Sequence, residues 1–252
     1  WRNHSAIGTA DVMYRGNPDD FKITEEEIEA LIREINESYP GAGLKREGVK
    51  LAFGGLRPVG KLARRYQIYD HQKVDGVAGL ITAIGAKYTE ARILAEKIID
   101  LVFMKLRKGM PKALTAATPL HGGQIKRFDD FLSLEMRKEP KGLSEEIVRH
   151  LVYHYGSEYG EILRYLDENP DNGQRMTNKS CVIKAEIIHG IRQEMAKKLT
   201  DIIFRRTELG TLGNPGEKCL KDCAAIMAAE LDWDERKTQR ELEEVRAAFS
   251  NG

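Results

Sequence analysis

The sequence is poor in cysteine and has neither a long hydrophobic run nor a surplus of charge of one sign. Its three cysteines are an odd number, which argues against a complete disulfide framework and favours a reducing compartment. No apolar run approaches the roughly 20 residues of a membrane-spanning helix, and we expect no signal peptide. We therefore predict a cytoplasmic chain whose contact with a membrane, if any, is peripheral.

The near balance of charges excludes a common class of partner. The 40 Lys and Arg residues exceed the 39 Asp and Glu residues by a single charge. Nucleic-acid binding depends on clustered cations that neutralise phosphates, so we predict no nucleic-acid partner. With 41% hydrophobic and 31% charged residues, the chain has the composition of a folded protein.

A dinucleotide-binding motif is also missing. Nowhere does Gly-x-Gly-x-x-Gly follow a strand and open a helix. The nearest candidate, formed by Gly210, Gly213 and Gly216, has the wrong spacing and follows a helical pattern. A loop between helices is the better interpretation of these glycines.

Hydrophobic periodicity divides the chain near residue 112. Residues 1–112 mix strand and helix signals, and after Gly109-Met110-Pro111 the strand signals stop. The sequence therefore predicts an α+β fold, with a partial mixed α/β domain over residues 1–112 and an all-helical domain over residues 113–252.

In the first of these parts, Thr24 and Glu27 form a capping-box pattern before an apolar stripe, which predicts a helix that ends near Pro40. A further helix is expected from about Tyr88 to Arg107. Strands are predicted over Val49–Phe53, Tyr66–Tyr69 and Val77–Ile84, the last apolar enough to be buried in a sheet.

In the second part, every predicted element is a helix. Helices are expected from Ser144 to Gly156, around Tyr159–Leu166, through Val182–Phe204 with a break at Gly190, over Glu217–Leu231 and over Asp234–Phe249.

Two turn-bounded segments carry the clearest chemical signal. In Phe53–Val59 an arginine follows a run of small residues that lets a ligand approach the backbone. In Gly79–Arg92 an apolar strand leads through a small turn and a lysine into a helix start, where backbone N–H groups favour anions. Together the segments indicate an anion site beside a cofactor.

The order and spacing of these segments resemble the C-terminal half of the FAD-dependent glycerol-3-phosphate dehydrogenases, which belong to a flavoprotein group that includes the D-amino-acid oxidases. That family has Gly-x-Arg-Pro after an aromatic and small residues, and later a strand ending in Gly-Gly-Lys-x-Thr-Thr. Further matches run almost end to end, at Ile7–Gly16, Thr118–Gly123, Ala185-Glu186 and Arg205–Leu209.

The resemblance implies an FAD enzyme that moves hydride from C2 of glycerol 3-phosphate to the flavin, yields dihydroxyacetone phosphate, and passes electrons to a quinone or another acceptor. It also implies that residues 1–112 are the C-terminal part of the FAD- and substrate-binding domain, with the N-terminal FAD-binding domain lying upstream of Trp1. The isolated chain is then expected to bind FAD poorly and to be inactive. A homo-oligomer is compatible with this prediction.

Three cations match the family's substrate-binding positions. Arg57 falls on the Gly-x-Arg-Pro arginine, Arg64 on the arginine before the next strand, and Lys87 on the lysine of the turn. A dianionic substrate requires several fixed donors, and the planar guanidinium matches phosphate oxygens. Arg65 takes the place of Arg64 if the register shifts by one. The alternative is that Arg57 anchors a turn and the other two are surface charges.

The turn itself matches the family's cofactor-binding segment. The resemblance places Gly85, Ala86, Lys87, Tyr88 and Thr89 against the flavin, although Thr89 serves equally well as a helix cap. The chain departs from the family here, because Ala86 replaces the second glycine. Two further departures follow the turn, with a glutamate for the second threonine at position 90 and an alanine for the following aromatic at position 91.

None of the six histidines is assigned to catalysis, because the resemblance places the family's catalytic histidine in the upstream half. His150 and His154 have the i, i+4 spacing of metal ligands, but no acidic residue completes a His-Glu-x-x-His pattern. Cys219 and Cys223 have no nearby histidine partner and are interpreted as buried thiols. We therefore predict no metal site.

Two alternatives remain open at this point. The first is a related flavoprotein that oxidises another small anion, such as an amino or hydroxy acid, because the Gly-x-Arg-Pro arginine can equally bind a carboxylate. The changes at Ala86 and Glu90 favour it, and the additional positive charge of Arg64 and Lys87 disfavours it. The second is a helical interaction module with no catalytic role.

Overall fold

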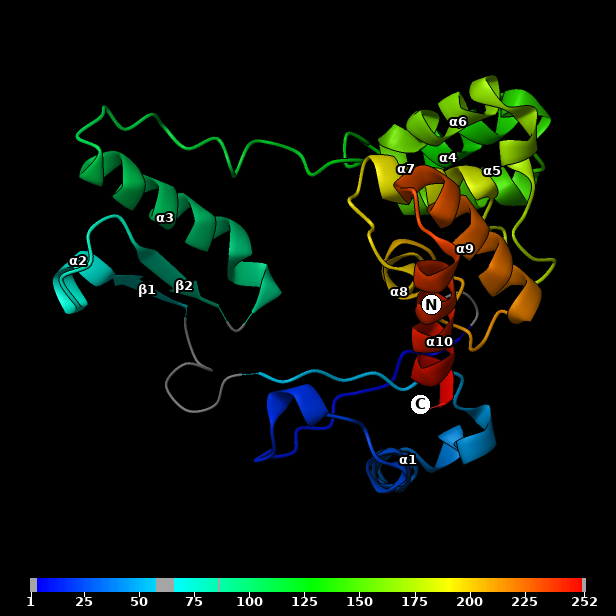
Figure 1. Cartoon of the computed structure of the whole chain (residues 1–252), viewed down its shortest axis with the longest axis horizontal. Helices are drawn as coiled ribbons and strands as arrows, with labels where there is room; N and C mark the ends of the chain where they lie inside the picture. The colour runs from blue at the N-terminus through cyan, green and yellow to red at the C-terminus, as the bar shows by residue number, and fades with distance from the viewer. Residues whose placement is uncertain (1–3, 58–65, 86, 251–252) are drawn as a thin grey trace. The chain divides into compact units, whose positions relative to one another are not determined.

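The computed structural model describes residues 4–57, 66–85 and 87–250, which form two compact units (Figure 1). We call the first the helical unit, which consists of the described parts of residues 1–13, 22–54 and 120–252. The second, the hairpin unit, consists of the described parts of residues 14–21 and 55–119. No helix in these described ranges is both long and apolar enough to cross a bilayer.

The hairpin unit is built on two short antiparallel strands. Strand β1 (Gln67–Asp70) pairs with β2 (Ile81–Ile84), with Gln67 opposite Ile84. Between the strands lies α2 (His71–Val74), and β2 leads through a short 3₁₀ turn into α3 (Ala91–Lys105). An ion pair of 2.6 Å between Lys105 Nζ and Asp70 Oδ1 ties the end of α3 to the end of β1.

Two of the three predicted strands need correction. Val49–Phe53 is coil and forms no strand with any other described segment, so its apolar residues have no ladder partner. Val77–Ile84 is a strand only from Ile81 onward. Gly76 and Gly79 both have positive φ, of 76° and 79°, so the chain turns just before Ile81 instead of extending as a strand.

The helical unit contains the remaining helices. They are α1 (Glu25–Ser38), α4 (Phe128–Arg137), α5 (Glu145–Tyr155), α6 (Tyr159–Glu168), α7 (Lys184–Arg192), α8 (Leu199–Asp201), α9 (Glu217–Leu231) and α10 (Glu235–Ser250). A π-helical segment, Ile202–Arg206, continues α8. Four of the predicted helices of residues 113–252 are present as α5, α6, α9 and α10, the one predicted over 182–204 is divided differently, and α4 is an additional helix that the sequence analysis did not predict.

Local sequence explains where α1 begins. Thr24 N–H donates to Glu27 Oε2 at 2.8 Å, and Glu27 N–H donates to Thr24 Oγ1 at 3.3 Å. This reciprocal pair satisfies two N–H groups that the first helical turn leaves without partners. The predicted capping box is therefore confirmed.

Helix α7 joins the two hydrophobic cores of the helical unit. Its Ile187 and Ile191 pack into a core with α8, α9 and α10, while its Ala185 and Ile188 pack into a second core with α4, α5 and α6. Because both sides of α7 are covered, all residues from 185 to 191 are buried. A polar side chain on α7 is consequently held in a fixed place between the cores.

The long helix predicted over residues 182–204 is interrupted, but not at Gly190. That glycine lies inside α7, where a Cβ would approach Ile202 Cδ1 to 2.9 Å, so its role is close packing. The helix ends at Arg192, and the chain reverses through Met195, which has φ +57°. Ala196 N–H then donates to the Gly190 carbonyl at 2.9 Å, which closes the turn.

Candidate functional site

The turn predicted to bind the flavin follows β2 directly. Lys87 and Thr89 are exposed, and Tyr88 is completely exposed at 100%. The N-caps of the 3₁₀ turn and of α3 are Lys87 and Glu90, and neither caps through its side chain, so Thr89 is the N-cap of neither. The side chains of this turn therefore extend into solvent from the start of a helix.

Gly85 brings the backbone of this turn close to α3. A Cβ at Gly85 would lie 3.3 Å from Leu94 Cδ2, which is a tight contact. Of the remaining predicted site residues, Arg57 is exposed, whereas Arg64 and Ala86 lie outside the described residues. Gly85, Lys87, Tyr88 and Thr89 are all exposed, so the described residues of this turn lie at the surface.

A second polar group, which sequence analysis did not assemble, lies inside the helical unit. His150 and His154 are on one face of α5, Glu186 is on α7, and Glu208 follows the π-helical segment. We call these four residues the histidine–carboxylate cluster. The side chains of His150 and Glu186 are 2% and 1% exposed, and those of Glu208 and His154 are 10% and 17% exposed.

Glu186 is held by donors from three directions. Its Oε2 accepts from His150 Nε2 at 3.0 Å and from the Tyr155 hydroxyl at 3.1 Å, and its Oε1 accepts from the Ile183 N–H at 2.9 Å. Because a buried carboxylate requires such partners, this network fixes the orientation of both Glu186 and His150.

Glu208 bridges the two histidines of the cluster. His150 Nδ1 lies 3.4 Å from Glu208 Oε1, and His154 Nε2 lies 3.3 Å from Glu208 Oε2. The two imidazole rings are 4.4 Å apart between centroids, as expected for neighbours one helical turn apart. Carboxylates thus face both ring nitrogens of His150.

This environment changes the pKa values of several groups. Burial alone lowers the pKa of His150, but hydrogen bonds to Glu186 and Glu208 outweigh it and raise the pKa to about 9. Burial and the Glu186 charge raise the pKa of Tyr155 well above its ordinary value. For His189, burial dominates and lowers the pKa.

A surface hollow of about 690 Å³ adjoins this cluster, since it is lined by His154 of the cluster and by Tyr155, which donates to Glu186. The loop of residues 120–123, Leu120-His121-Gly122-Gly123, also lines it. His189 and Glu194 also line it, so several titratable groups share one hollow.

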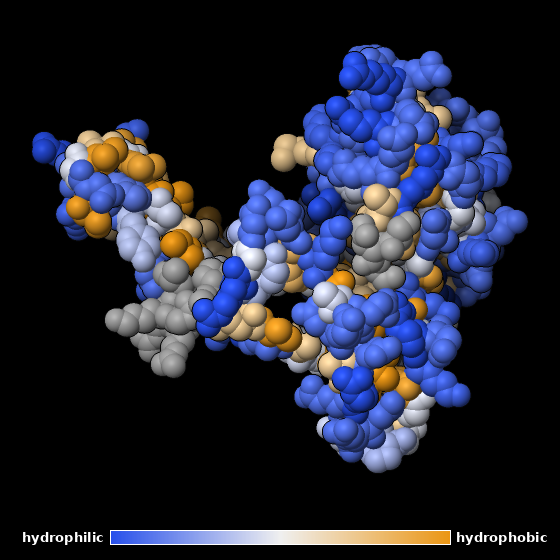
Figure 2. All heavy atoms as spheres, turned by 60° about the horizontal axis from the view of Figure 1, so that its bottom comes forward, coloured by the Kyte–Doolittle hydropathy of each residue, from blue (hydrophilic) through white to orange (hydrophobic). Residues whose placement is uncertain are grey.

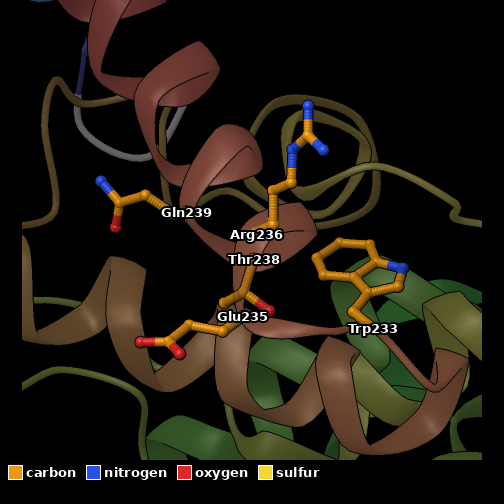
Figure 3. Close-up of a pocket in the computed structure, with 5 residues that line it drawn as sticks. All are labelled: Trp233, Glu235, Arg236, Thr238 and Gln239. Atoms are coloured by element: carbon orange, nitrogen blue, oxygen red, sulfur yellow. The ribbon is translucent and has the colours of Figure 1, made fainter.

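Another hollow, of about 580 Å³, lies where α10 begins (Figure 3). It is lined by Trp233, Glu235, Arg236, Thr238 and Gln239. Figure 3 shows these side chains pointing in different directions, with Gln239 and Glu235 turned away from the Trp233 ring. Because the polar groups do not converge, we assign no chemistry to this hollow.

Sequence analysis missed the cluster because its members are far apart in the chain. The i, i+4 spacing of His150 and His154 is visible in the sequence, but these residues form no local His-Glu-x-x-His pattern. Glu186 lies 36 residues from His150, and Glu208 lies 54 residues from His154. The motifs containing Glu186 and Glu208 were noted for their resemblance alone.

Comparison with known proteins points to one group. The family described as the C-terminal domain of alpha-glycerophosphate oxidase matches residues 113–238. Over 252 aligned residues, the chain is 32% identical to the glycerol-3-phosphate dehydrogenase of Synechocystis sp.. This alignment covers 96% of this chain and 45% of that protein. The chain is 26% identical to the aerobic glycerol-3-phosphate dehydrogenase of Staphylococcus aureus, with the same coverage.

A solved structure has the same fold. The glycerol-3-phosphate dehydrogenase from Bacillus halodurans, determined in complex with FAD, aligns with a TM-score of 0.79 at 24% identity. The alignment covers 96% of this chain and 48% of that one. The chain therefore spans about half the length of the relatives that it matches.

Proposed function

Since the chain belongs to the FAD-dependent glycerol-3-phosphate dehydrogenase family as a C-terminal portion, we propose that its parent protein oxidises sn-glycerol 3-phosphate to dihydroxyacetone phosphate. FAD, when bound, supplies the acceptor for the hydride that leaves C2 of the substrate. A base in the upstream part of the parent protein takes the proton of the substrate's C2 hydroxyl. A quinone or another acceptor then takes the electrons from the reduced flavin. The carrying observation is that relatives named for this activity match nearly the whole chain.

In this proposal the cations of the hairpin unit bind and orient the substrate. Arg57 offers a planar fork to the phosphate oxygens, and Lys87 offers a point charge at the start of a helix. Support comes from the exposure of both side chains, which leaves them accessible to a ligand. Arg64 is proposed as a further phosphate ligand on the sequence resemblance alone.

The described residues of the predicted flavin-binding turn have features suited to contact with the edge of the flavin ring. Gly85 lets the turn lie close to Leu94 of α3, and the 3₁₀ turn at Tyr88–Glu90 begins with N–H groups that lack partners within the helix. We propose that Gly85, Ala86, Lys87, Tyr88 and Thr89 hold the flavin ring by backbone donors, and that the Lys87 ammonium stabilises negative charge on it.

The surface of the hairpin unit favours an additional domain. None of its described residues is buried, and Figure 2 shows hydrophobic side chains at its surface. The large exposed ones on and after α3 include Ile93, Ile99, Met104, Leu106 and Met110, all at least 49% exposed. Such patches mark interaction sites. We propose that the upstream FAD-binding domain covers them, and that residues 1–112 and 113–252 belong to successive domains of the parent protein.

A carboxylate substrate is the second candidate. The family threonine is replaced by Glu90, and Glu90 Oε2 is one of two buried side-chain polar atoms without a hydrogen-bond partner among the described residues, the other being His189 Nδ1. An additional negative charge near the site would repel a dianionic phosphate more strongly than a monoanionic amino or hydroxy acid. The two candidates differ only in the anion that Arg57 binds.

The test uses the parent protein, with everything that lies upstream of Trp1. Its visible spectrum is recorded under anaerobic conditions before and after addition of glycerol 3-phosphate. Loss of the oxidised flavin band is the expected result. A flavin band that responds only to a carboxylate substrate selects the second candidate, and a protein without flavin overturns both. The 252-residue chain alone is expected to bind little FAD and to show no turnover.

A further inference from the structure

The histidine–carboxylate cluster brings three metal-ligand side chains to one point. His150 and His154 are one turn apart on α5, and Glu208 reaches them from a distant segment. One potential ligand atom from each residue lies within 4.8 Å of the other two. Two imidazole nitrogens and a carboxylate oxygen are the donor set of many zinc and iron(II) sites.

The distances agree with ligand spacing better than with direct ion pairing. Charge-assisted hydrogen bonds between nitrogen and oxygen are usually about 2.7–2.9 Å long. The two contacts of Glu208 with histidine nitrogens are longer and use different oxygens, at 3.4 Å from Oε1 to His150 Nδ1 and 3.3 Å from Oε2 to His154 Nε2, so either oxygen lies at ligand spacing from one imidazole. Ligand atoms that surround one ion tetrahedrally, at bonds of about 2.0–2.1 Å, are separated by about 3.3–3.4 Å.

A buried carboxylate already orients the first histidine. Glu186 accepts from His150 Nε2 at 3.0 Å, which directs the opposite nitrogen, Nδ1, toward Glu208. Histidine ligands of metals usually donate their second N–H to such a carboxylate. Tyr155 and the Ile183 N–H hold Glu186 in turn. The arrangement thus includes an outer support in addition to the three ligands.

Charge also balances with a divalent cation. Glu186 and Glu208 bring two negative charges to a region where their side chains are 1% and 10% exposed. Burial of charge is costly unless it is compensated. A divalent ion that displaces the proton from the ligating nitrogen of His150 is then bound by two neutral imidazoles, and its two positive charges compensate both carboxylates.

We propose that His150 Nδ1, His154 Nε2 and a carboxylate oxygen of Glu208 bind one divalent transition-metal ion, with Glu186 as the positioning residue for His150. The site is distinct from the proposed flavin and substrate segment, and it does not depend on the proposed function. A fourth position remains for water or another ligand, because the described residues supply three donors in this group.

The experiment uses the 252-residue chain without an affinity tag, stripped with a chelator and titrated with Zn²⁺ by calorimetry, with bound metal measured by mass spectrometry. One ion per chain is the expected stoichiometry. His154→Gln and Glu208→Gln, which preserve side-chain size, should each weaken Zn²⁺ binding at least about 100-fold, and Glu186→Gln about 10- to 100-fold. Circular dichroism checks that each variant is folded.

Two controls make the result decisive. His71→Gln removes a histidine that pairs with Asp75 on the hairpin unit, and it should leave Zn²⁺ affinity unchanged. Cys219→Ala with Cys223→Ala removes the buried free thiols of α9, and it should also have no effect. Binding that survives Glu208→Gln, disappears with the cysteines, or is absent from the original chain overturns the proposal.

Discussion

Gly122 and Gly156 meet backbone to backbone. A Cβ at Gly122 would lie 2.5 Å from the Tyr155 carbonyl oxygen, and a Cβ at Gly156 would overlap the Gly122 carbonyl. Ser157 N–H donates to that same Gly122 carbonyl at 2.9 Å. Both glycines have positive φ, of 74° and 56°. This contact fastens the 120–123 loop to the end of α5, beside the hollow lined by His154.

The first prediction concerns this contact. Gly156→Ala combines a left-handed backbone with a steric overlap, so we expect the free energy of unfolding to fall by about 2 kcal/mol or more. Gly160→Ala is the control, since nothing lies within 4 Å of a Cβ there. It should leave stability unchanged or raise it by up to about 1 kcal/mol. Urea denaturation measures both, and equal effects would contradict the packing argument.

The second prediction concerns a buried carboxylate in the core of α4, α5 and α6. The Tyr159 hydroxyl donates to Glu135 Oε2 at 2.5 Å, and the Glu135 side chain is 7% exposed. Tyr159→Phe removes this donor, leaving only the Lys138 contact at 2.7 Å among those described. We expect a loss of about 1–3 kcal/mol in thermal or chemical unfolding. Tyr153→Phe, at an exposed ring, should change stability by less than about 0.5 kcal/mol.

The third prediction is a pH dependence. Burial alone raises the pKa of Asp201, but N–H groups of Lys197 and Lys198, both at 3.0 Å, and the Arg205 guanidinium lower it below its ordinary 3.8. Because the pKa of Asp201 is lower in the folded protein than in the unfolded chain, its carboxylate stabilises the fold at pH values above the unfolded pKa. This stabilisation is lost as the pH falls through the folded pKa. Asp201→Asn should therefore cost about 1–2 kcal/mol at pH 7.

The cost of Asp201→Asn should shrink as pH falls below about 4, because the protonated aspartic acid then resembles asparagine. Stability curves of both proteins against pH provide the measurement. Arg205→Gln leaves the two backbone donors in place, so it should retain part of the pH effect. A cost for Asp201→Asn that stays constant down to pH 2 would disprove the assignment.

The fourth prediction separates the two proposed cations in the parent protein. Arg57→Ala should raise KM for glycerol 3-phosphate and lower kcat/KM by at least about 30-fold, because a charge-assisted phosphate contact is lost. Lys87→Ala should lower kcat and shift the flavin reduction potential downward, because the reduced ring loses a nearby cation. Lys108→Ala, an exposed lysine after α3, is the control. Unchanged kinetics in both site variants would remove these residues from the site.

Elements with strong local signals were predicted well. The capping box of Thr24 and Glu27 marks the start of α1, and α9 spans the predicted Glu217–Leu231. Both depend on side chains a few residues apart, which interact within one helical turn. The strand predicted over Val49–Phe53 was wrong because an apolar run becomes a strand only when another strand pairs with it, and sequence alone does not identify that partner.

The candidate functional residues also differ in how far the sequence predicts them. The turn at Gly85–Thr89 is a continuous segment, so its motif and its position after a strand were readable from sequence, with β2 ending at Ile84. The histidine–carboxylate cluster was not readable beyond its i, i+4 pair. Glu186 and Glu208 approach α5 only because α7 and the π-helical segment pack against it and its neighbours.

By itself, the sequence determined where α1, α5, α6, α9 and α10 lie, and its motifs resembled one family and marked the loop that carries the proposed flavin contacts. The helices depend on caps and apolar spacings within a few residues, and the resemblance depends on short motifs and their order along the chain. Tertiary structure alone decided that Gly122 meets Gly156 and that Glu186 and Glu208 converge on His150. The reason is that such contacts form when distant segments bury their apolar faces together, and the polar groups between those faces are then brought to fixed positions.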